Sequence, residues 1–444
     1  MSAIDGGAVA SGITIGLDIG TTSVKAVAVD GDGDIVAKAR VPHDLIAPDA
    51  AVFEHDAVQA WVHGPQRAIE QIGLADYDAI AIASMLPSFT AVDASGVPIS
   101  PGLLYGDHRG RAGEVIPDAL NSGEFRAMLE WTVANAPDAH GYWTAPAVAG
   151  VAIGGAPAID YGTAFALSPL WSGEWVASQL EPLGIRVDQM PLVFGDDEVA
   201  GHVGSAVQGC GIADAWAEAT VSGAGSGDVL VVCGTTLIAW CMVAAKVRVP
   251  GMWEFHHPFA DAHIVAGASN AGALFLNWVR RNLADSPGLA TDPAGVPIWV
   301  PYLRGERNPL HDTSLRASLH DLELGHGPAE ILRAAHEATG FVTRRYLDLA
   351  APGTTRVVAS GGGTHDGAWM QALADCTGLP VDLVAVPEGA ALGAAWHARV
   401  AAGLDRADDA GRWARRGRRY EPDPRWQEPC TQRYLRWRDL AGPH

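Results

Sequence analysis

The feature that most constrains the fold is a strand–turn–strand pattern that occurs once in each half of the chain. A Gly-Thr-Thr turn at 20–22 lies between two apolar, β-branched runs, and a second Gly-Thr-Thr turn at 234–236 lies between two more. Such runs, joined by glycine-containing turns, predict antiparallel strands. A strand–turn–strand unit that occurs once in each half predicts two related lobes, although a repeat of only three residues can also arise by chance.

The first lobe is expected to open as a meander. A third β-branched run at 35–41 follows a second Gly-rich turn at 31–34, so the order of elements differs from a βαβ unit. A P-loop or a dinucleotide fingerprint places its glycines between a strand and a helix, with a lysine or the full GxGxxG in register. The glycines near the N-terminus match neither pattern.

The amino-acid composition limits the classes of molecule that the protein is expected to bind. The chain has 444 residues, enough for two or three domains, and 48% hydrophobic against 18% charged residues indicates a globular protein. Its 51 acidic and 30 basic residues give a net charge of −21, which argues against nucleic acid, because phosphate binding needs a basic surface. Small molecules are therefore the expected partners.

The cysteines and the N-terminus suggest where the protein works. The five cysteines form no CxxC pair, which indicates neither a disulfide framework nor a zinc site and favours a reducing, cytoplasmic location. No signal-peptide pattern opens the chain, and no stretch approaches ~18 consecutive apolar residues, so no membrane span is expected. We expect residues 1–12 to be disordered, and the basic, aromatic tail from Arg412 to form a helix packed on the acidic body.

Between and after the two turns, the pattern predicts strands and helices in mixed order. The expected strands are 77–83, 89–93, 356–359 and 381–384, and the expected helices are 271–283, 329–349, 366–376 and 388–396.

The first turn carries the residue types of a phosphate and magnesium site. Gly20 lets backbone N–H groups approach an anion, and the hydroxyls of Thr21, Thr22 and Ser23 add donors. Asp18, at the end of a strand, is a carboxylate that can hold a hydrated divalent cation. The alternative is an ordinary tight hairpin capped by hydroxyl groups.

A third element, Gly361-Gly362-Gly363, lies between a predicted strand and a predicted helix. Three glycines leave a space without side chains, in which a flat base and a ribose can lie against the backbone at a helix start. A flexible loop is the alternative interpretation.

With these three elements in this order, the chain resembles the FGGY carbohydrate kinases of the actin-like, sugar kinase and heat-shock ATPase superfamily, over about residues 13–440. The loop 305–309, Gly-Glu-Arg-Asn-Pro, and the segment 316–337 resemble two further family motifs. The resemblance implies an α/β fold of two facing actin-like, ribonuclease H-like lobes with a central nucleotide cleft, and ATP and Mg²⁺ as cofactors. The positions that match the family's nucleotide motifs are Asp18, Gly20, Thr21 and Thr22, with Ser23 beside them; Gly234, Thr235 and Thr236; Gly361, Gly362 and Gly363; and Gly389 and Gly393.

The resemblance also assigns a catalytic base. The family carries an Asp at a helix start shortly before the second phosphate turn, and the counterpart here is Asp214; read alone, Asp214 would be a helix N-cap. Asp18 and Asp214 are the two carboxylates that the family places near magnesium. The chain is shorter than typical members after Arg109 and before Asp214, and the second gap leaves little room for the usual helix and buried strand, which predicts a poorly positioned base.

The substrate residues follow from the same resemblance. Asp107 and Arg109 match a segment that contacts sugar hydroxyls, and Asp160 matches another loop of the pocket, with a surface turn as the alternative. Where xylulose kinases carry Met-His-Gly, this chain reads Leu-Pro-Ser at 86–88.

The sequence therefore predicts an N-terminal lobe over 13–222 and a C-terminal lobe over 223–440. The predicted function is transfer of phosphate from ATP to a hydroxyl of a ketose or polyol, with D-xylulose or a related pentulose as the best guess. A homodimer is compatible with this prediction. The alternative is a degenerate, non-catalytic relative that binds nucleotide or sugar without turnover.

Overall fold

The computed structural model describes residues 12–49, 51–110, 124–256, 263–283, 290–386 and 388–442. Of the segment 1–12, for which we expect disorder, residues 1–11 lie outside these residues. The described chain divides into two compact units, and the division differs from a single cut near 222. Residues 390–413 belong with the first unit, whereas 222–389 and the chain from 414 onward form the second.

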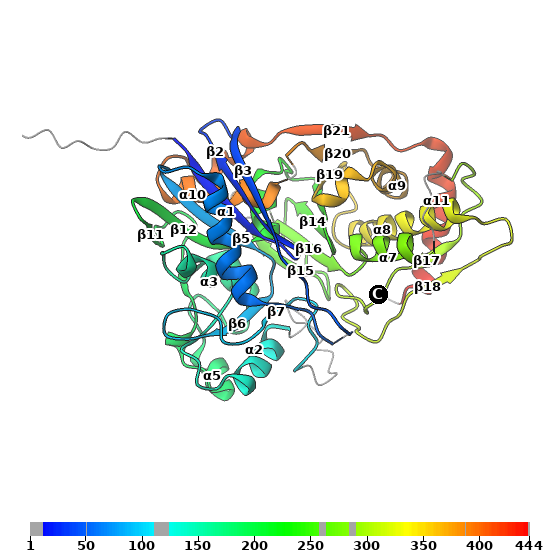
Figure 1. Cartoon of the computed structure of the whole chain (residues 1–444). Coiled ribbons are helices and arrows are strands. Elements are labelled where there is room, and N and C mark those ends of the chain that lie inside the picture. The colour runs from blue at the N-terminus through cyan, green and yellow to red at the C-terminus, as the bar shows by residue number, and fades with distance from the viewer. Residues whose placement is uncertain are drawn as a thin grey trace, which may run out of the picture. The chain divides into compact units, whose positions relative to one another are not determined.

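The first unit is built on a mixed sheet with the strand order β10-β9-β12-β5-β1-β2-β3, with β11 paired to β12 (Figure 1). Strands β1 to β3 form the predicted antiparallel meander, whereas β1, β5, β12, β9 and β10 run parallel. The bounds are β1 (Thr14–Ile19), β2 (Ser23–Val29), β3 (Ile35–Pro42), β5 (Ala79–Ser84), β9 (Ala158–Asp160), β10 (Leu192–Phe194), β11 (Gly201–Val203) and β12 (Ala206–Ala213). Every residue of β1 and β5 is buried, which explains their continuous apolar sequence.

A smaller antiparallel sheet, in the order β4-β7-β6-β8, and several helices complete this unit. Its strands are β4 (Glu54–His55), β6 (Ser88–Val92), β7 (Gly102–Leu104) and β8 (Gly141–Trp143). Its helices are a π-helix (Val58–His63), α1 (Gly64–Ile72), α2 (Glu124–Asn135), α3 (Ala145–Ala152), α4 (Tyr161–Ala166), α5 (Ala177–Leu180), α6 (Asp214–Val221) and, from Ala390 on, α10 (Gly389–Ala401), with 3₁₀ turns at Glu181–Leu183, Val187–Gln189 and Ala407–Trp413.

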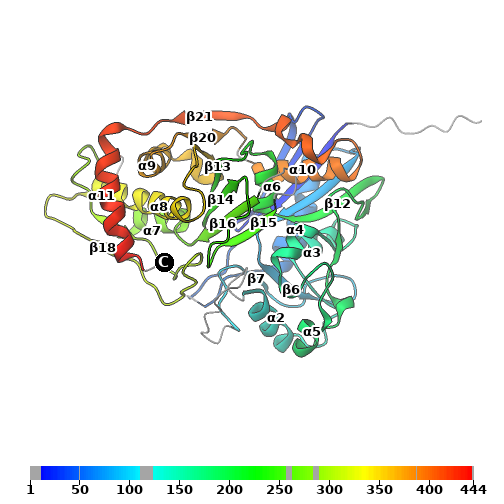
Figure 2. The same ribbon diagram turned by 180° about the vertical axis from the view of Figure 1, so that it is seen from behind.

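Helix α10 packs against strand β1 of the mixed sheet and against helix α6, in each case at a glycine (Figure 2). A Cβ atom on Gly16 of β1 would collide with the backbone of Ala391 and Ala395, and one on Gly393 would collide with the backbone of Ala217 in α6. Such close approach of backbones requires glycine. Gly393 is therefore a packing residue in the first unit.

The second unit has a sheet in the order β15-β16-β14-β13-β19-β20-β21, in which β13 and β14 form the second predicted hairpin. The strands are β13 (Asp228–Cys233), β14 (Leu237–Val243), β15 (Trp253–His256), β16 (His263–Ser269), β19 (Arg356–Ser360), β20 (Val381–Val384) and β21 (Arg416–Tyr420), with a separate pair β17 (Ile298–Val300) and β18 (Ser318–His320). The helices are α7 (Ala273–Asn282), α8 (Pro328–Ala350), a 3₁₀ turn (Gly362–His365), α9 (Gly367–Thr377) and α11 (Pro424–Leu440). The predicted helices and strands of this half are confirmed to within a few residues at their ends, except in the tail. The predicted helix from Arg412 begins only at Pro424, and residues 416–420 form the strand β21.

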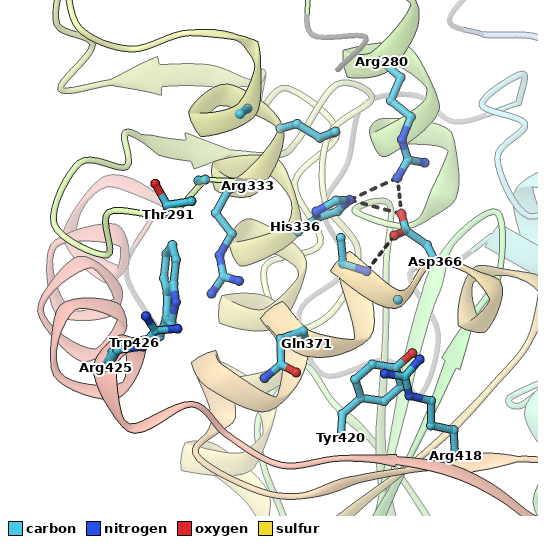
Figure 3. Close-up of a pocket in the computed structure, with 15 residues that line it drawn as sticks. Arg280, Thr291, Arg333, His336, Asp366, Gln371, Arg418, Tyr420, Arg425 and Trp426 are labelled. Carbon is cyan, nitrogen blue, oxygen red and sulfur yellow. Dashed lines mark hydrogen bonds and ion pairs between the residues drawn. The ribbon is translucent and has the colours of Figure 1, made fainter. Parts of the chain in front are cut away.

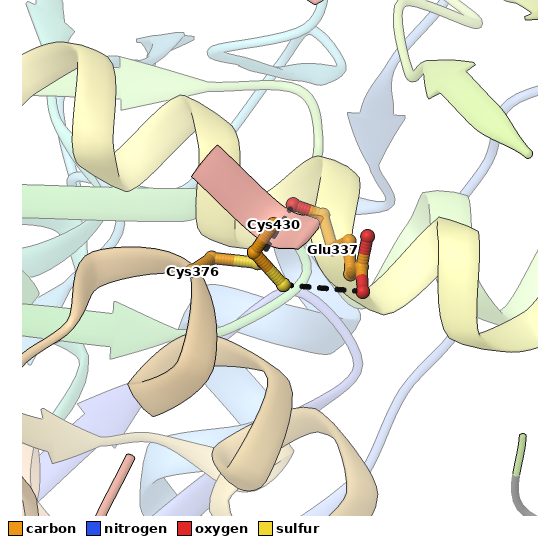
Figure 4. A group of neighbouring side chains, drawn as sticks. All are labelled: Glu337, Cys376 and Cys430. Atoms are coloured by element: carbon orange, nitrogen blue, oxygen red, sulfur yellow. Dashed lines mark hydrogen bonds between the residues drawn. The ribbon is translucent and has the colours of Figure 1, made fainter. Parts of the chain in front are cut away.

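A buried ion-pair cluster ties α8, α9 and α11 together (Figure 4). Glu337 of α8 lies beside the thiols of Cys376 and Cys430, whose sulfur atoms are 3.9 Å apart. Arg433 donates to both carboxylate oxygens of Glu337 at 2.7 Å, and Arg333 donates to one at 2.9 Å. Because two guanidinium groups already neutralise the carboxylate and keep its pKa below the usual value in spite of burial, we interpret the cluster as an anchor for α11.

Among the residues that the structure describes, none of the helices combines the length and the apolarity needed to cross a lipid bilayer.

Candidate functional site

The first Gly-Thr-Thr turn closes the hairpin between β1 and β2. The Gly20 N–H donates to the Ser23 carbonyl oxygen at 3.0 Å, and Asp18 lies opposite Lys25 in the register of the two strands. The Lys25 ammonium donates to Asp18 Oδ2 at 2.9 Å, and the charge of Asp18, with a smaller contribution from Glu218, raises the pKa of Lys25. The turn therefore holds a buried carboxylate with its charge partly compensated.

Two side chains of the smaller sheet region hold Thr21 in place. His55 Nε2 donates to the Thr21 carbonyl oxygen at 2.8 Å, because its Nδ1 accepts from Trp61 Nε1 at 3.0 Å and so carries no hydrogen. Burial lowers the pKa of His55 to about 4, which keeps the ring neutral near pH 7. The Tyr105 hydroxyl lies 3.2 Å from Thr21 Oγ1. The contacts of His55 and Tyr105 thus fix the position of Thr21 without a ligand.

Asp214 is the first residue of α6 and directly follows β12. The predicted lack of a buried strand before it is wrong: the glycine-rich run itself forms β12, which is buried over nearly its whole length and includes an irregularity between Gln208 and Gly211. A strand without bulky side chains fits where Pro146 and the backbone of Ala158 approach Gly211 closely.

Parallel pairing brings Asp214 to the same edge of the sheet as Asp18. Ala213 pairs with Ser84 of β5, and Ser84 pairs with Ile19 of β1. Asp214 and Asp18 therefore lie at the ends of β12 and β1, which are separated by the one strand β5. Two strand spacings correspond to about 10 Å. The two residues therefore lie at one edge of the sheet, with the strand β5 between their strands.

Asp107 and Arg109 form one polar cluster with Glu54. Our sequence analysis did not predict Glu54 as a member of this site. Arg109 donates to Asp107 Oδ2 at 2.7 Å and also forms an ion pair with Glu54, and its guanidinium lies over the ring of Trp131, 4.3 Å from the centroid. Asp107 is buried and accepts from the Phe53 N–H at 2.9 Å. The two carboxylates leave this cluster with an excess negative charge.

Asp160 lies elsewhere in the same unit, and no contact among the described residues joins it to Asp107 or Arg109. Its Oδ1 caps α4 by accepting from the Thr163 N–H at 2.8 Å. Its carboxyl group also interacts with that of Asp196, a second residue that we did not predict. Burial raises the pKa of Asp160, and burial together with the Asp160 charge raises the pKa of Asp196 to about 8. The pair is expected to share a proton near neutral pH.

Replacing Asp196 by Asn is expected to change how stability depends on pH. Asp196 keeps its proton in the folded state up to about pH 8, whereas the unfolded chain loses it near its ordinary value of 3.8, so stability falls as pH rises between these values. Asn cannot ionise, and we expect the variant to be more stable than the parent at pH 8 by about 1–3 kcal/mol. Urea unfolding at pH 5 and pH 8 measures the difference, with Asp76→Asn, which removes an exposed carboxylate of the same unit, as control. Parallel pH profiles for parent and Asp196→Asn would contradict the shared proton.

The second Gly-Thr-Thr turn, between β13 and β14, is one residue tighter than the first. The Gly234 N–H donates to the carbonyl oxygen of Thr236, two residues on, at 3.0 Å, whereas the Gly20 N–H donates to that of Ser23, three residues on. The start of α7 adds to it, since the N–H groups of Ala273 and Leu274 donate to the carbonyls of Gly234 and Thr235 at 2.9 and 3.1 Å. The two hairpins therefore share a sequence pattern but differ by one residue in the length of the turn.

The Gly-Gly-Gly turn follows β19 and lies beside the second hairpin. Gly361 has φ of +86°, and a Cβ on it would meet the Cys233 carbonyl oxygen at 2.9 Å. Gly363 leaves no space for a Cβ because of the Trp369 ring, whereas Gly362 faces open space. Packing thus requires two of these glycines, and only Gly362 has the vacancy expected beside a ligand.

The predicted residues therefore fall into three groups. Within the first unit the structure brings together Asp18, Lys25 and the 20–23 turn, and it builds separate clusters around Arg109 and around Asp160. Within the second unit it brings Cys233, the residue just before the 234–236 turn, against the 361–363 turn. Gly389 begins α10, and Gly393 packs on α6.

Some of the missed residues had signals in the sequence. Lys25 is the one charged residue in an otherwise apolar strand, Ser23–Val29, which is unusual for a buried strand. Glu54 begins a two-residue strand and Asp196 lies in a turn, and at neither position does a sequence pattern distinguish a partner of Arg109 or Asp160 from a surface residue.

Comparison with known proteins gives consistent matches. Two models of the FGGY family of carbohydrate kinases match, the N-terminal domain over residues 13–118 and the C-terminal domain over 229–402. A xylulose kinase of Escherichia coli K12 is 25% identical over 88% of this chain and 91% of its own, and a gluconokinase of Bacillus subtilis is 25% identical over 86% of each. The crystal structure of xylulose kinase from Rhodospirillum rubrum superposes with a TM-score of 0.78 at 25% identity, covering 96% of this chain and 98% of that one.

Proposed function

The chain belongs to the FGGY family of carbohydrate kinases, which phosphorylate sugars with ATP, and from this premise we propose that it phosphorylates a hydroxyl of an open-chain ketose or polyol, with D-xylulose or a related pentulose as the leading substrate. The observation that carries the proposal is that Asp18 and Asp214 lie at the same edge of one sheet, at the ends of two strands that both run parallel to β5. A phosphoryl transferase needs a carboxylate for the attacking hydroxyl and a second one for the metal on the phosphate.

Asp214 is proposed as the general base. It accepts the proton of the attacking hydroxyl, and its place at the end of a buried strand and the start of a helix gives it a rigid position. Its Oδ1 accepts from the Ala215 N–H at 2.7 Å, at the first turn of α6.

The turns at 20–23 and 234–236 are proposed to bind the phosphates of ATP through backbone N–H and hydroxyl groups, and Gly362 to lie beside the adenosine. Asp18 is the proposed holder of Mg²⁺ through water. The carboxylate of Asp18 is the kind of oxygen ligand that a divalent cation prefers, and the charge of Glu218 also acts on the Lys25 ammonium that pairs with Asp18. Bound magnesium would neutralise charge on the transferred phosphate, while Lys25 keeps Asp18 oriented.

The charge of the Arg109 cluster favours an uncharged sugar over an acid such as gluconate. Both Asp107 and Glu54 pair with Arg109, so no cation is left over for a substrate carboxylate within this cluster. Carboxylate oxygens of this kind accept hydrogen bonds from hydroxyl groups and reject substrates that lack them.

ADP release with MgATP tests the proposal against a panel of D-xylulose, D-ribulose, glycerol and gluconate. We expect turnover with one pentulose and the highest kcat/KM for it. Turnover with gluconate alone would contradict the charge argument, and nucleotide binding without turnover on any acceptor would contradict the kinase function itself.

A further inference from the structure

Helix α8 contributes side chains to two separate polar sites of the second unit. In its N-terminal half, His336 lies in a pocket of about 640 Å³ with Arg280 and with Asp366, which follows the 361–363 turn (Figure 3). We take this pocket as part of the proposed nucleotide site. In its C-terminal half, the Tyr346 hydroxyl donates to the carbonyl oxygen of Asn308 at 2.9 Å. The loop 305–309, to which Asn308 belongs, has no part in the function proposed above.

The carboxylate of Glu306 is the centre of this loop, and the residue is only 3% exposed. Its Oε2 accepts from the Ser269 hydroxyl at 2.6 Å. Its Oε1 accepts from the N–H groups of Asn270 and Arg307, at 3.1 and 2.6 Å. Because an ionised carboxylate only accepts hydrogen bonds, three donors at its two oxygens suit the charged form.

The segment 269–272 connects this carboxylate to the second Gly-Thr-Thr turn. Ser269 pairs with Leu237, the first residue of β14 after the turn, and its Oγ also accepts from the Ala271 N–H at 3.0 Å. Gly272 lies so close to the backbone of residues 235–236 that a Cβ atom would collide with it. A change in the contacts of the carboxylate therefore reaches the turn through four consecutive residues.

Glu306 is the group of this cluster whose charge changes near neutral pH. The charged and titratable groups around it are Arg307 and Tyr302 of the same segment, Arg345 and Tyr346 of α8, and Asp312, whose backbone pairs with that of Glu306. Burial raises the pKa of Glu306 to about 7, and the hydrogen bonds that it accepts and the charge of Arg345 offset the effect only in part. Burial and the charge of Glu306 raise the pKa of both tyrosines, which stay neutral. The Ser314 hydroxyl lowers the pKa of Asp312, which stays ionised.

From this geometry we propose that Glu306 is a positioning residue for phosphate binding, whose ionised carboxylate holds residues 269–272 against the turn at 234–236. The proposal rests on the proposed function, in which this turn binds the phosphates of ATP. A proton taken up by the carboxylate is placed on Oε2, because Oε1 already accepts from two N–H groups. The Ser269 hydroxyl then loses its charged acceptor, and the contact becomes a weaker, neutral one. The affinity for ATP should therefore fall as the pH falls through about 7.

Glu306→Gln tests the proposal, because the amide keeps the shape of the side chain and resembles the protonated acid at every pH. The full-length parent and variant are titrated with Mg²⁺ and a non-hydrolysable ATP analogue between about pH 5.5 and pH 8.5. The ratio of the two dissociation constants cancels the titration of the nucleotide itself. We expect the variant to bind as tightly as the parent at the lowest pH and about fivefold or more weakly at the highest, a typical coupling between two sites.

Two further variants make the comparison specific. Glu323→Gln, which removes an exposed carboxylate of the same unit, should bind like the parent at every pH. Ser269→Ala removes the other partner of the same hydrogen bond, and we expect for it the same pH-dependent ratio. If Glu306→Gln does not fold, Ser269→Ala therefore provides the test.

A ratio that stays constant with pH overturns the proposal, because a merely structural loss weakens binding equally at every pH. A second measurement needs no nucleotide. Hydrogen–deuterium exchange at pH 8 should be faster in residues 271–276 of Glu306→Gln than of the parent, and unchanged in α9, because the N–H groups of Ala273 and Leu274 bond the turn. Equal exchange in 271–276 also overturns the proposal. If the parent binds no nucleotide, the proposed function fails, and the exchange rates still show whether Glu306 supports the turn.

Discussion

Asp214→Asn is expected to lower kcat by about 10³-fold while leaving the dissociation constant for ATP within a few-fold of the parent value, because the amide cannot take the proton of the attacking hydroxyl. Asn is the suitable replacement, because Asp214 also begins α6 and Asn is as good an N-cap as Asp. The helix should therefore persist, and the loss should appear in the chemical step. Steady-state kinetics with saturating sugar and a separate nucleotide-binding titration distinguish the two effects.

The matched control for this experiment is Asp188→Asn, which removes an exposed carboxylate of the same unit. It should retain the parent kcat. If Asp214→Asn also retains it, the assignment of the base is wrong, and another carboxylate of this unit, such as Glu218, becomes the candidate.

Gly393→Ala is expected to destabilise the protein by about 3 kcal/mol, because the added Cβ collides with the backbone of Ala217 and α10 must move away from α6. In an open helix the same change stabilises by about 1 kcal/mol through helix propensity, so the sign of the effect is diagnostic. Thermal or urea unfolding followed by circular dichroism measures it.

Gly411→Ala provides the comparison, since Gly411 lies in the same unit, with nothing within 4 Å of its Cβ position. It should change stability little. An unchanged melting temperature for Gly393→Ala, accompanied by a raised KM for ATP, would instead support the contact with adenosine that the family resemblance suggests.

The sequence predicted the parts of the fold that depend on local chemistry. The strands around both Gly-Thr-Thr turns are β-branched runs, and their continuous or alternating apolar residues are enough to predict buried strands. The strand β20 has the bounds that we expected, 381–384. The position of Asp214 after a strand could not be read in the same way. Gly209 and Gly211 weaken strand propensity, and tertiary packing against neighbouring strands overrides it.

The parts that were missed depend on contacts between distant segments. Glu54 meets Arg109 only because β4 pairs with β7. Asp196 meets Asp160 only because β10 pairs with β9. Gly393 lies within a Gly-Ala pattern typical of a nucleotide-binding helix, and the collision with Ala217 that explains it is visible only once α6 and α10 are placed.

The membership of residues 390–413 in the first unit has a consequence for biosynthesis. A ribosome that has released only residues 1–221 has produced the strands of this unit without the helix that covers Gly16, and their apolar surface stays open until almost the whole chain has emerged. Unlike a protein whose N-terminal domain folds first during synthesis, this one must complete its first unit late. A fragment that ends near residue 222 would accordingly be an incomplete folding unit. In the full chain, the first unit is completed only after most of the second unit has been synthesised.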